Sequence, residues 1–176
     1  MTLYLVRHAM PAVDPGSDPA SWELSAGGRG AARALASKLP KYALLAASDE
    51  PKARQTLSPE GERQLVIDHR LGEVHRTEAF DDDFRTLRRR YVSGHTVPGW
   101  EPQATVAGRF AAAIAECEFL AGDRDLVIAS HGMAMTVWLD EVIGLADPAA
   151  FWADLQFPDL LKVDLPARTV TRLITR

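Results

Sequence analysis

The sequence predicts an α/β protein, a three-layer α/β/α arrangement with a mostly parallel central sheet. Two observations predict this class. Short apolar runs rich in β-branched residues alternate along the chain with stretches of strong helix formers. The 176 residues are 47% apolar, which is enough for a substantial core, so we expect residues 1–176 to form a single domain.

Six segments have the length and composition of strands. We expect strands at residues 3–6, 43–47, 64–67, 126–129, 160–164 and 169–173. The last two flank Pro166-Ala167-Arg168, which is typical of a turn, so this pair can run antiparallel at an edge of the sheet.

Four longer segments alternate with these strands and predict helices at residues 31–39, 51–57, 105–120 and 133–143. Ser25 is a plausible cap before the first helix, and Pro51 suits the first turn of the second. Gly122 and Gly144 follow the last two helices and are typical of helix ends.

Residues 75–104 break the alternation and predict a small cap inserted beside the sheet edge. Three aspartates at 81–83 can begin a short helix, because acidic side chains suit the positive N-terminal end. One face of that helix would carry Phe84, Leu87 and Tyr91, and the rest Arg85, Arg88 and Arg89. These arginines either form a solvated face or reach a substrate anion.

Composition argues against several classes of protein. The net charge of −4, without a basic tail, predicts neither nucleic acid nor membrane as a partner. No apolar run approaches the ~18–20 residues of a membrane span. Cys117 is the sole cysteine, so we expect a packing role for it and a cytoplasmic location for the protein. The spacing of His69, His75 and His95 is not that of metal ligands, so we expect no metal and no cofactor.

Two of the predicted strands end in the same way. Arg7-His8-Ala9 follows the strand at 3–6, and Ser130-His131-Gly132 follows the strand at 126–129. The carboxyl ends of parallel strands share one edge, where α/β sheets place ligands. A neutral imidazole can act as a nucleophile, and an arginine fork fits a phosphate. If the strands are neighbours, the two imidazoles and the guanidinium converge on one phosphate site.

Four segments resemble, in order, motifs of the histidine phosphatase superfamily, in its phosphoglycerate-mutase-like branch. Residues 5–9 resemble the family's Arg-His-Gly motif, and 24–28 its Leu-Thr/Ser-x-x-Gly. Residues 47–56, Ala-Ser-Asp-Glu-Pro-Lys-Ala-Arg-Gln-Thr, resemble its Ser-Ser-x-x-x-Arg-Ala-x-Gln-Thr. Residues 130–132 resemble its second His-Gly. The resemblance covers residues 3–143.

The resemblance implies a covalent phosphohistidine on His8, with Arg7, Lys52 and His131 binding the phosphate and His131 also taking part in catalysis. Lys52 departs from the family, which usually has arginine there. Lysine keeps the charge but lacks the bidentate fork. Arg54 is a poor substitute, because residues two apart on a helix face different ways.

A general acid must also protonate the leaving oxygen. Leu71-Gly72-Glu73 resembles the Leu-x-Glu that carries the family's acid, so Glu73 is the candidate. Asp49, Glu50 and Glu101 are held in reserve for the same role.

These residues predict a metal-independent phosphomonoester hydrolase that acts on a small phosphorylated substrate. The mutases extend their first motif as Arg-His-Gly-Glu-Ser-x-x-Asn, whereas this chain has Met10, Pro11 and Asp14 at the last three fixed places. That difference favours water over a second substrate as the phosphoryl acceptor. The alternatives are a non-catalytic phosphate-binding module, a mutase-type phosphotransferase and a protein phosphohistidine phosphatase with a phosphoprotein partner. The sequence chooses neither the substrate nor the oligomeric state.

Overall fold

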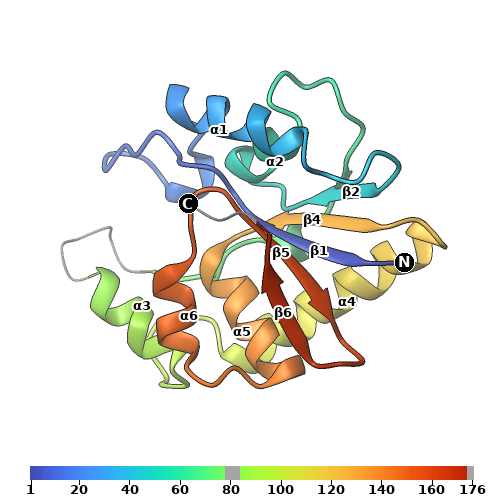
Figure 1. The fold of residues 1–176 in the computed structure, drawn as a ribbon. Coiled ribbons are helices and arrows are strands. Elements are labelled where there is room, and N and C mark those ends of the chain that lie inside the picture. Colours follow the sequence, from blue (N-terminus) through green and yellow to red (C-terminus); the bar gives the residue numbers. More distant parts are fainter. Residues whose placement is uncertain (78–83, 174–176) are drawn as a thin grey trace.

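A computed structural model describes residues 1–77 and 84–173 of the chain (Figure 1). In these ranges six strands form one sheet in the order β3-β2-β4-β1-β5-β6. The strands are β1 (Leu3–Arg7), β2 (Leu44–Ala47), β3 (Val66–Ile67), β4 (Leu126–Ser130), β5 (Asp159–Asp164) and β6 (Thr169–Arg172). The first four pair in parallel, and β5 runs antiparallel to both β1 and β6. The predicted α/β class with an antiparallel edge is therefore confirmed.

The helices cover both faces of the sheet. They are α1 (Ala26–Ala36), α2 (Pro51–Leu57), α3 (Phe84–Val92), α4 (Gln103–Ala121), α5 (Gly132–Ile143) and α6 (Pro148–Asp154). Figure 1 shows α1 and α2 on one face and α3 to α6 on the other. Because side chains alternate across a strand, Leu5 and Ile128 pack under α4 and α5, whereas Val6 and Val127 pack under α1 and α2.

The two central strands set the position of the site. β1 and β4 are buried from both sides, which explains their nearly continuous apolar sequence. In their register Arg7 lies opposite Ser130. The next residues, His8 and His131, therefore leave the sheet together, and the His8 N–H donates to the Ser130 carbonyl at 3.0 Å.

Two helices differ from the prediction. Helix α1 begins at Ala26 instead of residue 31, because the Ser25 hydroxyl caps it by accepting from Gly28 N–H at 3.0 Å. The cap expected at Ser25 is confirmed, whereas the glycines that follow it kept the predicted helical stretch from reaching back to it. Gly28 is needed because a Cβ there would lie 2.1 Å from the Met10 carbonyl oxygen. Helix α6 was not predicted, because seven residues span less than two turns and show little periodicity.

The insert packs its helix α3 against α5 and α6 (Figure 1). Tyr91 is buried, and its hydroxyl donates to the Glu101 carbonyl at 2.8 Å. Arg88 is buried as well, so of the two interpretations left open for these arginines a solvated position does not hold for Arg88. The aspartates at 81–83 and the side chain of Phe84 lie outside the described residues.

Two further expectations concern single features. Cys117 is buried in α4, and this burial raises the pKa of its thiol to about 11, as suits a packing residue. Over the ranges that the structure covers, no helix is long and apolar enough to cross a membrane.

Candidate active site

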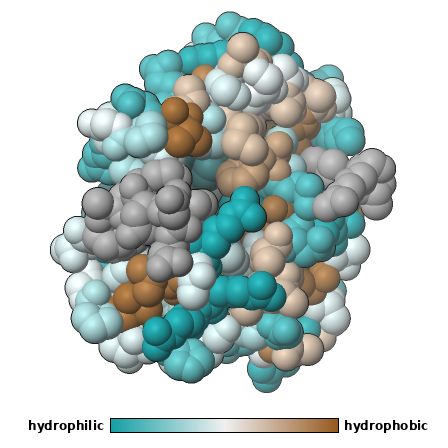
Figure 2. All heavy atoms as spheres, turned by 90° about the vertical axis from the view of Figure 1, so that its left-hand side faces the viewer, coloured by the Kyte–Doolittle hydropathy of each residue, from teal (hydrophilic) through white to brown (hydrophobic). Residues whose placement is uncertain are grey.

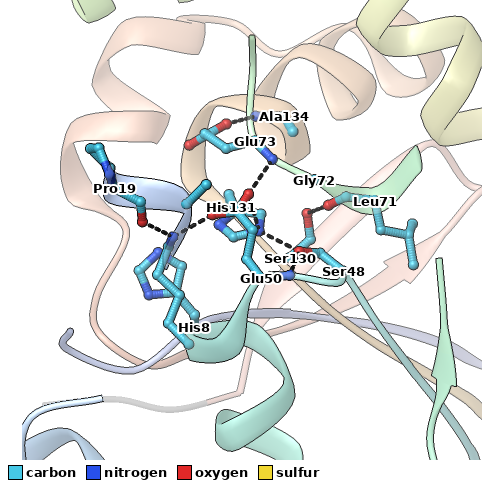
Figure 3. Close-up of polar contacts among 12 residues, drawn as sticks. His8, Pro19, Ser48, Glu50, Leu71, Gly72, Glu73, Ser130, His131 and Ala134 are labelled. Carbon is cyan, nitrogen blue, oxygen red and sulfur yellow. Dashed lines mark hydrogen bonds and ion pairs between the residues drawn. The ribbon is translucent and has the colours of Figure 1, made fainter. Parts of the chain in front are cut away.

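A cleft of about 1250 Å³ opens at the carboxyl edge of the sheet. The five predicted site residues all line it: Arg7, His8, Lys52, Glu73 and His131. Figure 2 shows this side of the molecule, where strongly hydrophilic residues lie between apolar ones. The close-up in Figure 3 shows residues from four separate segments gathered around His131. The structure thus brings together side chains that are up to 124 positions apart, from Arg7 to His131.

The His8 ring is oriented by a hydrogen bond at one of its two nitrogens. Its Nδ1 lies 2.8 Å from the Ala9 carbonyl oxygen, which can only accept, so Nδ1 carries the hydrogen and Nε2 carries the lone pair. The ring lies between His131 and Phe157, with centroid distances of 5.2 and 5.3 Å. Burial, and then the charge of His131, lower the pKa of His8 well below its usual value. The imidazole is therefore neutral at pH 7, as a nucleophile requires.

The turn after His8 is fixed by the third motif segment, residues 47–56. Thr56 on α2 accepts a hydrogen bond from Ala9 N–H at 2.8 Å, and Gln55 accepts one from Leu24 N–H at 2.8 Å. These two contacts give a physical reason for the Gln-Thr pair in the motif. They tie α2 both to the nucleophile turn and to the loop that leads into α1.

Arg7 is oriented by the segment between α6 and β5. Its guanidinium carbon lies 3.5 Å from the Phe157 ring centroid, and NH1 donates to the Leu155 carbonyl at 2.6 Å. The Nε atom is buried without a hydrogen-bond partner. Burial lowers the pKa of Arg7 to about 10, so the side chain still carries its charge at pH 7. The Nε–H of Arg7 is therefore a charged donor that can bind a ligand.

Lys52 is buried at the start of α2 and already has two partners. Its Nζ donates to the Pro19 carbonyl at 2.6 Å and forms an ion pair with Glu50. Arg54, in contrast, is exposed and lies outside the cleft, as the helical geometry predicted. Lys52 is therefore the cation of this helix that faces the cleft.

Glu73 spans the gap between its own loop and helix α5. Oε1 accepts from Val74 N–H at 3.0 Å and from Ala134 N–H at 2.9 Å, whereas Oε2 has a single contact, to Met133 N–H at 3.3 Å. The first N–H groups of a helix can bind a phosphate. Here two of them donate to Glu73, and His131 at the cap position makes no capping bond with its side chain.

Two residues that the sequence left in reserve have other roles. Glu101 forms an ion pair with Arg109 at 2.8 Å and does not line the cleft. Arg109 donates to the carbonyls of Arg70, Gly72 and Glu73 and so fixes the loop that carries the candidate acid. Glu50, the second reserve, lies inside the site and contacts His131, Lys52 and the Glu73 backbone.

Three parts of this site were not predicted from the sequence: Phe157, the Leu155 carbonyl and Arg109. They act through stacking and backbone contacts, which leave no motif. A basic residue within an otherwise apolar and small-residue stretch of α4 is the one signal that pointed to Arg109. In the part of the chain that the structure describes, no group of three His, Cys, Asp or Glu side chains has the arrangement of a metal site.

Comparisons with known proteins establish the family of the chain and agree with its fold. The sequence model of the histidine phosphatase superfamily (branch 1) matches residues 3–163. A mycobacterial glucosyl-3-phosphoglycerate phosphatase, solved with vanadate, superposes with a TM-score of 0.72 at 22% identity over 93% of this chain and 92% of that one. A protein from Thermus thermophilus, TTHB049, gives 0.66 at 24% identity over the whole of both chains.

A candidate alpha-ribazole-5′-P phosphatase from Escherichia coli K-12 gives a TM-score of 0.67 at 19% identity, over 100% of this chain and 96% of that one. No curated protein sequence matches the chain. The structural likenesses show the fold, and the family match shows the relationship. The chain belongs to branch 1 of the histidine phosphatase superfamily. Within that superfamily it is an enzyme of the phosphatase class.

Proposed function

We propose that this chain is a phosphomonoester hydrolase that forms a covalent phosphohistidine on His8. The observation that carries the proposal is the His8 ring, whose Nδ1–H is tied to Ala9 and whose Nε2 lone pair is therefore the reactive position. Arg7 lies next to it with a buried Nε that has no protein partner. A nucleophile and an anion-binding donor side by side are what phosphoryl transfer requires.

The reaction then has two steps. His8 Nε2 attacks phosphorus, the ester P–O bond breaks, and Glu73 protonates the leaving oxygen. Oε2 of Glu73 is the oxygen suited to carry that proton, because it has one long contact while Oε1 has two. Water next attacks the phosphohistidine, the P–N bond breaks, and the water's proton passes to Glu73. His8 returns to its neutral form and Glu73 to its protonated one.

The walls of the cleft support a substrate larger than phosphate itself. Its lining includes the apolar side chains of Met10, Val13 and Trp22. It also includes four arginines, Arg76, Arg85, Arg88 and Arg89. A phosphomonoester with an apolar portion and a further anionic group would suit both kinds of lining residue.

Hydrolysis of 4-nitrophenyl phosphate tests the proposal, and we expect it to need no metal. Enzyme dialysed against a chelator should keep its full rate, because the proposed positive charge on the phosphoryl oxygens comes from side chains. The measurement is the release of nitrophenolate before and after dialysis, with magnesium or zinc added back as the control. A loss of activity that either ion restores would contradict the proposal.

Lys52→Ala is expected to lower kcat/KM by about ten- to a hundredfold, because a desolvated charge-assisted hydrogen bond is worth ~1.5–3 kcal/mol. Lys52→Arg should keep the wild-type rate or exceed it, since it restores the fork. The matched control is Arg54→Ala, on the same helix but outside the cleft. Equal activity of Lys52→Ala and the wild type would remove Lys52 from the phosphate site.

A further inference from the structure

Glu50 is a carboxylate inside a pocket that is proposed to bind an anion, and the mechanism above gives it no role. Its side chain is only 11% exposed. Oε1 lies 3.1 Å from His131 Nε2 and accepts from Glu73 N–H at 2.9 Å, and Oε2 pairs with Lys52 (Figure 3). A buried negative charge at this position repels a phosphate. Its presence is favourable only if it also stabilises a positive charge that binds the phosphate.

His131 is the side chain on which Glu50 can act. Glu50 Oε1 forms an ion-pair contact of 3.1 Å with His131 Nε2, and because a carboxylate only accepts, this contact favours the tautomer that carries its hydrogen on Nε2. Ser48 Oγ lies 2.8 Å from the same nitrogen and itself accepts from Glu50 N–H at 3.1 Å. The other ring nitrogen, Nδ1, is buried without a hydrogen-bond partner. In the neutral ring Nδ1 therefore carries a lone pair, which would repel a phosphate oxygen.

We propose that Glu50 is a positioning residue that acts through His131: it holds Nε2–H and becomes the counter-ion when His131 takes up a proton at Nδ1 as a phosphate dianion binds. The proton comes from solvent. Nδ1–H then donates to a phosphate oxygen, while Nε2–H donates to Glu50. Carboxylates in other proteins orient a histidine ring and stabilise its imidazolium form in the same way. The inference rests on the proposed function, because it needs the anion to bind beside His131.

Charges on every side decide when this proton is taken up. Those that face His131 are Arg7 and His8 after β1, Glu50 and Lys52 at α2, Glu73 and Arg76 in the loop after β3, and Arg109 on α4. Without an anion, burial is the largest effect, and it lowers the pKa of His131 to about 3. Glu73 opposes this in its ionised form, and the neighbouring cations add to the lowering. A bound dianion adds two negative charges to the same space, which favours the imidazolium form.

The test follows the protonation state of His131 with sulfate as the probe, because sulfate stays a dianion near neutral pH. Nitrogen NMR shifts of the His131 ring, assigned with His131→Asn, distinguish one protonated nitrogen from two. Glu50→Gln keeps an oxygen that can accept from Glu73 N–H but lacks the charge. Asp49→Asn is the matched control, since Asp49 is the neighbouring carboxylate that also lines the cleft. The affinity for sulfate alone is not a sufficient readout. Glu50→Gln also removes the ion-pair partner of Lys52, which can then bind the anion itself.

We expect saturating sulfate to protonate both ring nitrogens of His131 in the wild type at pH 7. In Glu50→Gln the pH at which the bound form loses this proton should fall by about one unit or more, as expected for a charge within ~4–6 Å, and Asp49→Asn should behave as the wild type. A singly protonated His131 in the wild-type complex would overturn the inference, as would equal shifts in the two variants. Absence of any sulfate response at His8 and His131 would overturn both the inference and the proposed function.

Discussion

Replacing His8 with alanine is expected to lower kcat/KM by about 10⁴-fold or more, because removal of a nucleophile abolishes the covalent route. In the wild type, rapid quenching with a ³²P-labelled substrate should leave label on His8 that is stable in base and labile in acid. The structure gives the reason: His8 presents a neutral ring whose Nδ1–H is already committed to Ala9.

His69→Ala is the matched control for this experiment. His69 also lines the cleft, but its side chain is 83% exposed, so its loss should change neither the rate nor the label. Label on any other residue, or normal turnover by His8→Ala, would refute the covalent mechanism.

Glu73→Gln is expected to slow the hydrolysis of an alkyl phosphate by about 10²–10⁴-fold and that of a nitrophenyl phosphate far less. An alkoxide is a strong base that needs the proton, whereas nitrophenolate leaves without much help. The measurement is kcat/KM for both esters with both proteins. Glutamine can still place its carbonyl oxygen where Oε1 accepts from Val74 and Ala134, so the loop should stay in position.

Helix α5 also depends on Glu73, since a lost capping contact costs ~0.5–2 kcal/mol, so the melting temperature of the variant must be measured alongside its rates. A uniform loss on both esters would mean that Glu73 positions other groups and does not supply the proton. Wild-type rates on both would transfer the role of the acid to Glu50 or Asp49, which the same pair of esters can test.

How far the sequence predicts this site depends on the kind of contact involved. The meeting of His8 and His131 follows from periodicity, because two buried strands with the same ending must share an edge once they pair in parallel. The proximity of Lys52 and Glu73 came from the resemblance, since no periodic pattern places a helix start and a loop over that edge. The prediction was therefore good where strand geometry alone decides position.

Other parts depend on tertiary contacts that single residues do not reveal. A glutamate just before a helix is ordinary, because it suits the helix dipole, so nothing marks Glu50 as the centre of a polar cluster. Phe157 can stack on Arg7 only because β5 lies beside β1, a pairing that the sequence did not specify. The sequence left open whether Arg88 is solvated, because helical periodicity does not report neighbouring elements, and its burial depends on how α3 lies against α5 and α6.

The position of β1 between β4 and β5 has a consequence for synthesis of the chain. β1 leaves the ribosome before the other described strands, and it must wait for partners that begin at Leu126 and Asp159. Until then its apolar Leu-Tyr-Leu-Val segment has two open edges, which makes it a target for chaperones or for aggregation. Such long-range pairing also slows folding, because loop closure must precede the contacts that reward it. Phosphatase activity should therefore appear late during translation, after Leu155 and Phe157, which orient Arg7, have left the ribosome.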